Sequence, residues 1–313
     1  MIDIFYLDSV IKKVNISEIA SLKNKFMWVD VSSITKEEAK IIGDFFDLHP
    51  LTVEDFINQK IRIKVEEFPN YILCIFYGIE KSKSVELFEM DFVVGKNFVI
   101  SNHKNKINSF ELLKSSPEKL ESLFKKGSDF LMHKLLDSEV DNYFPVLEEI
   151  GDKIELLEDK VVKSAQPRYL SEILRLKRLV VTIKKYTFAQ REKTSFLAKN
   201  DYKLISKKAI PYFRDIYDHA IRVSDKVDDY REAVGNAFDV YMSSMANNSN
   251  EVMKTLSIIA TIALPLTVIS GIYGTNFEIL PGADFPFGFW AMILFMLILS
   301  VSMLWFFRKR NWF

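Results

Sequence analysis

The sequence lacks the residues and motifs that several large classes of enzyme depend on. It contains a single cysteine, Cys74, so no disulfide and no thiolate metal cluster can form within one chain. Its four histidines, His49, His103, His133 and His219, are scattered without the spacing typical of a zinc site. No phosphate-binding loop and no nucleophile elbow is present. We therefore expect neither an enzyme nor an ATP-driven machine.

The chain also lacks net charge, because 42 Lys and Arg residues balance 42 Asp and Glu residues. Proteins that bind nucleic acid usually carry a basic patch or stripe, so we expect no nucleic-acid partner. The first ten residues, MIDIFYLDSV, lack a basic region followed by an apolar stretch. We therefore expect no cleaved signal peptide.

Charged side chains are absent from two stretches near the C-terminus, residues 255–277 and 285–307. A helix of 23 residues is about 34 Å long, which exceeds a hydrocarbon core of about 30 Å. Two buried helices of a soluble core are the alternative, but such helices rarely run this long without a polar stripe. The stretches predict two transmembrane helices joined by an outer loop, residues 278–284, with the lipid bilayer as a partner.

The flanks of these stretches predict their orientation. Lys254 precedes the first stretch, a basic tail of residues 308–313 follows the second, and the loop carries only Glu278 and Asp284. Lys and Arg concentrate on the cytoplasmic side of membrane proteins. We expect a multi-pass protein of the cell membrane, inner or plasma, with both termini cytoplasmic.

The first 125 residues mix short apolar runs with helical patches, which predicts an α/β cytoplasmic domain. The strands are expected at residues 26–31, 71–79, 86–94 and 98–101. Gly95-Lys96-Asn97 predicts a hairpin turn between the last two. Thr35 and Glu38 have the spacing of a capping box, so a helix is expected from there to Phe46.

Residues 126–254 change to long, charged helical patterns, expected at 129–163 and 168–199. A third pattern runs from Pro211 to Tyr273 and corresponds to a helix of about 95 Å. Such a helix needs long neighbours, which other subunits supply most simply. The predicted fold is an α+β cytoplasmic domain with long helices, whose longest helix continues into the first of two C-terminal transmembrane helices.

Eight residues in and just before the first span fall on one helical stripe, since they recur in steps of three and four. They are Asn250, Met253, Leu256, Ala260, Leu264, Thr267, Gly271 and Gly274. The stripe suits an ion path with apolar constrictions, which gate by dewetting. Small residues that let the second span approach closely are an equally good interpretation. The second span has no residue more polar than Ser300 and Ser302, so the first span is expected to be the inner one.

The segment Tyr273-Gly274-Thr275-Asn276-Phe277 resembles the CorA family of magnesium transporters, whose signature is Gly-Met-Asn after such a helix. The second span and the basic, Trp-containing tail resemble that family too. Further similar segments are residues 49–55, 211–219, 250–254, 258–261 and 265–267. The resemblance therefore extends over the whole chain.

This resemblance implies a homopentamer whose cytoplasmic part is shaped as a funnel, with five copies of the first span lining one pore and the second spans outside. Gly274, Thr275 and Asn276 would form the selectivity filter. A ring of amide oxygens can accept hydrogen bonds from hydrated Mg²⁺, which releases its waters reluctantly. Met253, Leu256 and Leu264 are the candidates for the tightest constriction. The implied activity is passive Mg²⁺ influx driven by the membrane potential.

The resemblance also implies control by cytosolic Mg²⁺ bound between subunits, which holds the pore shut. The matching acids are Glu54, Asp55, Asp137 and Asp215. One or two carboxylates with several waters make a weak site that suits millimolar Mg²⁺. Helix caps or solvated charges are the alternative interpretation of each acid.

Two departures leave the transported ion open. Thr275 replaces the Met of the signature, as in the zinc-transporting ZntB-like branch, where this position varies. Leu280-Pro281-Gly282 replaces the Met-Pro-Glu of the outer loop, so Glu278 or Asp284 is expected to attract cations instead. A carrier of Zn²⁺, Co²⁺ or Ni²⁺, with or without proton coupling, is the first alternative. A membrane-anchored metal sensor or scaffold that transports nothing is the second.

Overall fold

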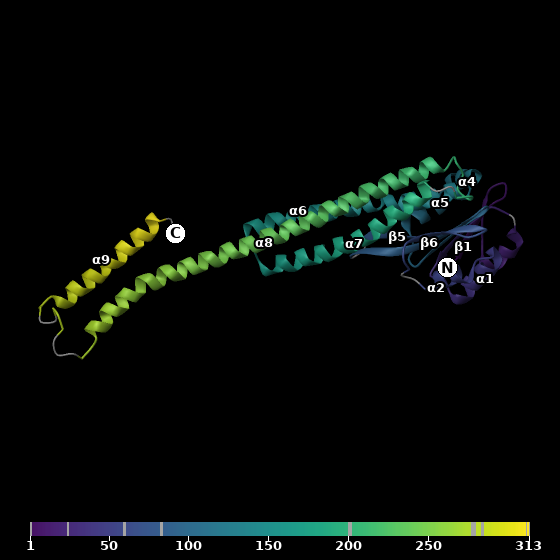
Figure 1. Ribbon diagram of the computed structural model, residues 1–313. Coiled ribbons are helices and arrows are strands. Elements are labelled where there is room, and N and C mark those ends of the chain that lie inside the picture. Colours follow the sequence, from purple (N-terminus) through teal and green to yellow (C-terminus); the bar gives the residue numbers. More distant parts are fainter. Residues whose placement is uncertain are drawn as a thin grey trace. The chain divides into compact units, whose positions relative to one another are not determined.

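The computed structural model describes residues 2–23, 25–58, 61–81, 84–199, 202–276, 280–282, 285–310 and 312. The chain divides into two compact units. The first consists of Met1–Asp159 and Arg168–Phe238, and the second of Lys160–Pro167 and Asp239–Phe313. Figure 1 labels the helices and strands along the chain.

A seven-stranded sheet forms the centre of the first unit, in the order β2-β1-β3-β7-β6-β5-β4. Its strands are β1 (Ile2–Leu7), β2 (Ile11–Val14), β3 (Met27–Ser32), β4 (Lys64–Glu67), β5 (Tyr71–Lys81), β6 (Val85–Gly95) and β7 (Phe98–His103). β3 and β7 pair in parallel, and all other neighbours are antiparallel. The expected strands and the 95–97 hairpin are therefore confirmed.

Helices cover both faces of this sheet, because its strands place apolar side chains alternately on either side. One face packs against a short 3₁₀ helix (Ile16–Leu22) and helices α1 (Lys36–Phe46) and α2 (Pro50–Ile57). The other packs against α3 (Asn108–Lys114), α4 (Pro117–Lys126) and α5 (Ser128–Asp141). The side chains of α2 and α5 thus lie on opposite sides of the sheet.

The structure corrects the helix expected at 129–163. It consists of α5 and α6 (Tyr143–Lys163), separated at Asn142. Pro145 is the physical reason, because a proline has no N–H for the carbonyl four residues earlier, here that of Asp141, and its ring clashes with that carbonyl. Tyr143 secures the new start, since its buried hydroxyl donates to the Tyr77 carbonyl at 2.8 Å.

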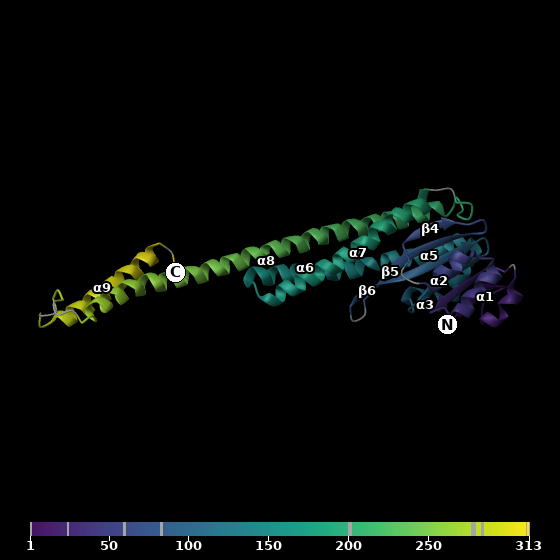
Figure 2. The ribbon, with the colours of Figure 1, turned by 60° about the horizontal axis from the view of Figure 1, so that its bottom comes forward.

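The two longest helices agree with the sequence prediction. α7 covers Pro167–Lys199, and α8 covers Ile210–Tyr273 without a break. At 64 residues α8 is about 96 Å long. Within the first unit it lies beside α6 and α7, as both views show (Figures 1 and 2). The ion pairs Lys226–Glu148 (3.5 Å) and Arg191–Asp225 (3.9 Å) join these helices.

The second unit contains the rest of α8 and α9 (Gly288–Lys309). These are the two helices of the described residues that are long and apolar enough to cross a membrane. An open hollow of about 440 Å³ lies between them, bordered on α8 by Thr261 and on α9 by Ser302, Met303, Trp305, Phe306 and Phe307. The two helices therefore lie beside each other at this level.

Candidate ion pathway and regulatory metal sites

The stripe expected to line a pore lies on the C-terminal part of α8 and is exposed along its whole length in the single chain. Its members are Asn250, Met253, Leu256, Ala260, Leu264, Thr267 and Gly271. Leu264 is 68% exposed, and Met253 and Leu256 are each 58% exposed. Helix α9 therefore does not cover this stripe.

The opposite face of α8 is the covered one. Ile258 is 9% exposed, and Ile262, Pro265 and Ile269 are half-buried at successive steps of four, three and four. Each lies two residues before a stripe member, and two residues correspond to about 200° around a helix. Small residues for close contact with α9 would have to lie on the covered face, whereas Ala260 and Gly271 do not. The structure thus weakens the packing interpretation of the stripe.

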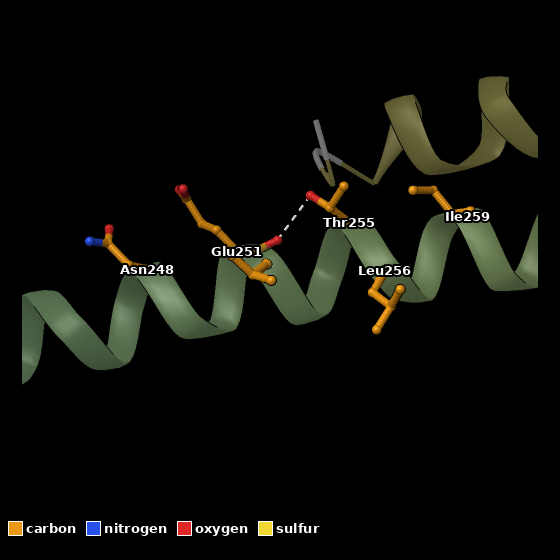
Figure 3. A pocket seen from close by; sticks show the side chains of 6 residues that line it. Asn248, Glu251, Thr255, Leu256 and Ile259 are labelled. Carbon is orange, nitrogen blue, oxygen red and sulfur yellow. Dashed lines mark hydrogen bonds between the residues drawn. The ribbon is translucent and has the colours of Figure 1, made fainter.

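A second open hollow, of about 490 Å³, runs along α8 beside the stripe. It is lined by Asn248, Glu251, Val252, Thr255, Leu256 and Ile259, of which Leu256 alone belongs to the stripe (Figure 3). The Thr255 hydroxyl donates to the Glu251 carbonyl at 3.0 Å, so it is satisfied within the helix. Every lining residue belongs to α8, so this hollow is the exposed surface of one helix and not a pocket between elements.

The residues expected to form the filter, Gly274, Thr275 and Asn276, follow directly after α8 and are exposed. The Gly274 N–H donates to the Ser270 carbonyl at 2.9 Å, and a Cβ at Gly274 would lie only 3.0 Å from that oxygen. The Thr275 hydroxyl donates to the Ile272 carbonyl at 2.7 Å. The helix therefore ends in a tight turn that favours glycine and leaves the Asn276 amide exposed.

The acids expected in the outer loop, Glu278 and Asp284, lie outside the described residues. Of the loop's Leu280-Pro281-Gly282, the Pro281 carbonyl accepts a hydrogen bond from the Tyr273 hydroxyl at 2.9 Å. This contact ties the loop to the end of α8.

Two of the four expected regulatory acids, Asp137 and Asp215, occur in one cluster between α5 and α8. Asp137, Asp141 and His219 each offer a ligand atom, and these atoms all lie within 4.8 Å of one another. His219 contacts Asp141 through Nδ1 at 2.7 Å and Asp215 through Nε2 at 3.8 Å. Lys134 pairs with Asp137 at 3.0 Å. Carboxylates beside an imidazole are a donor set for a divalent metal.

Asp141 and His219 are not among the acids and ligands expected from the sequence, in which the histidines look unrelated. Asp141 and His219 are 78 residues apart, so no local motif joins them. The signal available was spacing, since Asp137 and Asp141, like Asp215 and His219, stand four residues apart on one helix face. His133 lies one turn before Asp137. Burial lowers the pKa of His133, although the charges of Asp137 and Asp215 act to raise it.

The other two expected acids, Glu54 and Asp55, lie in the second turn of α2 and not at its start. Lys64 of β4 pairs with Asp55, with 2.7 Å between Nζ and Oδ2. Glu54 is exposed, and its Oε1 accepts a weak hydrogen bond from Asn58 at 3.4 Å. Because α2 and α5 cover opposite faces of the sheet, one chain does not bring all four acids together.

A buried polar layer lies beneath α2. Asp91 and Asn102 face each other on β6 and β7, and each is 1% exposed. The Asn102 amide donates to Asp91 at 2.7 Å and to the Phe56 carbonyl of α2 at 3.2 Å. Burial, with the charge of Glu89, raises the pKa of Asp91 well above its usual range. Asn102 thus fixes the C-terminal turn of α2 to the sheet.

Two apolar helices, an exposed stripe along one of them and a cluster of carboxylates with an imidazole are the features of a membrane protein that handles small cations. A family model described as CorA-like Mg²⁺ transporter protein matches residues 23–309. The chain belongs to this family, whose members are divalent cation transporters and not enzymes, and it resides in the membrane.

Individual relatives agree with this assignment. The cobalt/magnesium transport protein CorA of Thermotoga maritima is 36% identical over 290 residues, which cover 91% of this chain and 83% of that protein. The zinc transport protein ZntB of Photorhabdus laumondii is 25% identical over 272 residues, which cover 85% and 82%. The solved CorA magnesium transporter from Methanocaldococcus jannaschii shares the fold, with a TM-score of 0.89 at 23% identity, over 100% of this chain and 99% of that one.

Proposed function

We propose that this chain forms a homopentameric channel through which Mg²⁺ enters the cell passively, driven by the membrane potential. The observation that carries the proposal is the exposed stripe of α8, which faces away from α9 and ends at the Asn276 amide. Five such stripes around an axis would form a path that begins with amides, narrows at bulky apolar rings and ends at a ring of amide oxygens. The potential supplies about 4.6 kcal/mol per 100 mV for a divalent ion.

Exposed apolar side chains support the oligomer. Leu174, Val181, Phe188 and Phe196 recur along α7 and are 37% to 53% exposed in the single chain. A long helix that exposes such residues needs further partners to cover them. Neighbouring copies of the same chain supply those partners without a second gene product.

Regulation by cytosolic Mg²⁺ is the second part of the proposal. Glu54 and Asp55 lie on one side of the sheet, while Asp137, Asp141 and Asp215 lie on the other. An acid pair of one subunit can therefore meet the cluster of the next subunit, and a shared metal would join them. Without the metal the carboxylates repel one another, which loosens the interface and favours opening.

Transport of Zn²⁺, Co²⁺ or Ni²⁺ is the second candidate, and His219 is the observation that favours it. An imidazole nitrogen beside Asp137 and Asp141 suits these metals better than Mg²⁺, which prefers oxygen. Thr275 in the filter and the relative named a zinc transporter point the same way.

Ion flux into proteoliposomes tests the function. Uptake of Mg²⁺, Co²⁺, Ni²⁺ and Zn²⁺ is measured at a negative-inside potential for the wild type and for Asn276→Ala. The proposal expects potential-dependent Mg²⁺ uptake that Asn276→Ala changes. Uptake of Zn²⁺ or Co²⁺ without Mg²⁺ would select the second candidate, and no uptake of any ion would leave a sensor or scaffold.

The same assay tests the loop acids. We propose that Glu278 and Asp284 attract incoming cations, so neutralising both is expected to reduce uptake at low Mg²⁺ and to have little effect at high Mg²⁺. Unchanged uptake at low Mg²⁺ would dismiss this role.

A further inference from the structure

Helix α2 holds its acids in a fixed position on the sheet. At its N-terminal end the Tyr71 hydroxyl accepts from the His49 N–H at 3.0 Å and pairs with the Thr52 hydroxyl at 2.8 Å. At its C-terminal end the Asn102 amide donates to the Phe56 carbonyl at 3.2 Å. Both anchoring side chains, Tyr71 and Asn102, are 1% exposed. Asp55 is therefore presented by a helix that is secured at both ends.

Lys64 supplies a cation to Asp55 from the neighbouring edge strand. Its Nζ lies 2.7 Å from Asp55 Oδ2 and 3.0 Å from Glu66 Oε2. The Lys64 and Asp55 side chains are only 23% and 19% exposed, so solvent screens this pair less than a surface pair. The backbone of Lys64 is held by the pairing of β4 with β5, in register with Ile75. The ammonium group is thus built into the fold beside the carboxylate.

The ammonium would lie beside any metal ion held by Asp55. A metal on the oxygen that already contacts the ammonium at 2.7 Å would have to use that oxygen's second lone pair, which places two positive charges close together. If the metal binds the other oxygen instead, the ammonium lies within a few ångströms of it and repels it. In either geometry the charge of Lys64 disfavours a metal ion at Asp55, because α2 is hydrogen-bonded to the sheet at both ends and holds Asp55 beside Lys64.

We propose that Lys64 is an internal competitor for the regulatory metal at Asp55 and so sets how much cytosolic Mg²⁺ closes the channel. This inference rests on the proposed regulation by Mg²⁺ and adds to it the residue that tunes it. In the metal-free state the lysine neutralises Asp55, and in the metal-bound state it withdraws toward Glu66. A site that is weakened in this way responds to a high Mg²⁺ concentration and does not close the channel at trace levels.

The test is Mg²⁺ titration on the cytosolic face of excised inside-out patches that contain the full-length protein. Lys64→Met is expected to lower the half-inhibitory Mg²⁺ concentration by about fivefold or more, since removal of a repelling charge strengthens the site. Lys64→Arg, which keeps the charge, is expected to stay near the wild type. Lys12→Met is the matched control, because Lys12 is also a strand lysine paired with an aspartate, Asp8 at 2.9 Å.

The direction of the shift separates competition from a structural role. If Lys64 merely supported the fold around Asp55, its removal would weaken the site and raise the half-inhibitory concentration. An unchanged or raised value in Lys64→Met, or in Lys64→Gln if the first variant does not fold, overturns the inference. Asp55→Asn distinguishes failure of the Lys64 proposal from failure of the regulatory site: if this variant does not weaken Mg²⁺ inhibition, the proposed regulatory site itself is wrong.

Discussion

Single side chains of the first unit show how strongly a buried charge depends on its partners. Lys114 pairs with Asp30 at 2.6 Å and with Asp3 at 3.0 Å, and His103 contacts Asp30 at 3.0 Å. Burial alone would raise the pKa of Asp30, but the hydrogen bond from His103 and the charges of His103 and Lys114 hold it below its usual range. Asp30 is thus a charged group in the core that Lys114 and His103 stabilise.

The first prediction concerns this network. Lys114→Met is expected to destabilise the first unit by about 3 to 5 kcal/mol, because it leaves a buried charge without its partner. Lys119→Met is the control, since Lys119 is exposed on the neighbouring α4. Denaturation followed through Trp28 measures the effect, and its indole donates to Ser101 beside Asp30 at 2.9 Å. Equal stability of the two variants would contradict the account.

The same network limits the stability of the first unit at low pH. The folded-state pKa of Asp30 lies below the unfolded value of about 3.9, so its contribution is complete above that pH and is lost as the pH falls through the folded-state pKa. The wild type is therefore expected to lose stability below about pH 4. The loss is expected to be smaller in Lys114→Met, where the part of that contribution that comes from Lys114 is already gone.

The second prediction concerns the α5–α8 cluster. His219→Ala is expected to weaken inhibition by cytosolic Co²⁺ more than inhibition by Mg²⁺, because imidazole is a better ligand for Co²⁺. Asp141→Asn is expected to weaken both. Half-inhibitory concentrations measured in patches give the result, and Asp239→Asn, on the same helix beyond the cluster, is the control. If His219→Ala weakens inhibition by both ions equally, the imidazole nitrogen is not a metal ligand.

Among the elements, those with local signals were predictable and those that depend on distant residues were not. The capping box of α1 forms as expected, with Glu38 N–H donating to the Thr35 hydroxyl at 3.2 Å and Thr35 N–H donating to the Glu38 carboxylate at 2.9 Å. Strands β1, β2 and β4 were missed, because β2 and β4 have only four residues each and β1 depends on β3 for its pairing.

The candidate site residues show the same difference between local signals and contacts with distant residues. The stripe of α8 is periodic along one helix, so the sequence alone places its residues on one face, but it left open whether that face lines a pore or packs against the second span. The cluster around His219 depends on the packing of α5 against α8, which no local pattern encodes. The break at Asn142 was not predicted, although Pro145 is a local signal for it.

The third prediction is made for α8 as an element. Replacing Met253, Leu256 or Leu264 with Ser is expected to raise leak current at whichever ring is the constriction, because a polar ring no longer dewets. Ile259→Ser is the control, since Ile259 is 59% exposed but lies off the stripe. Unchanged leak in all three variants would defeat the apolar gate.

For the whole molecule, the account depends on which face of α8 meets the permeating ion. The chain is well suited to a direct test, because its only cysteine, Cys74, is fully buried in the sheet and burial raises the pKa of its thiol. A thiol reagent should therefore leave the wild type active, so that any block reports an introduced cysteine.

The most direct measurement is block of Mg²⁺ flux by a charged thiol reagent at two positions of α8, two residues apart. Thr267→Cys lies on the exposed stripe, and Pro265→Cys, with Ile269→Cys as a second variant, lies on the half-buried face opposite the stripe. The account predicts strong block at Thr267→Cys and little at the other two. Block at Ile269→Cys with none at Thr267→Cys would contradict the pore assignment.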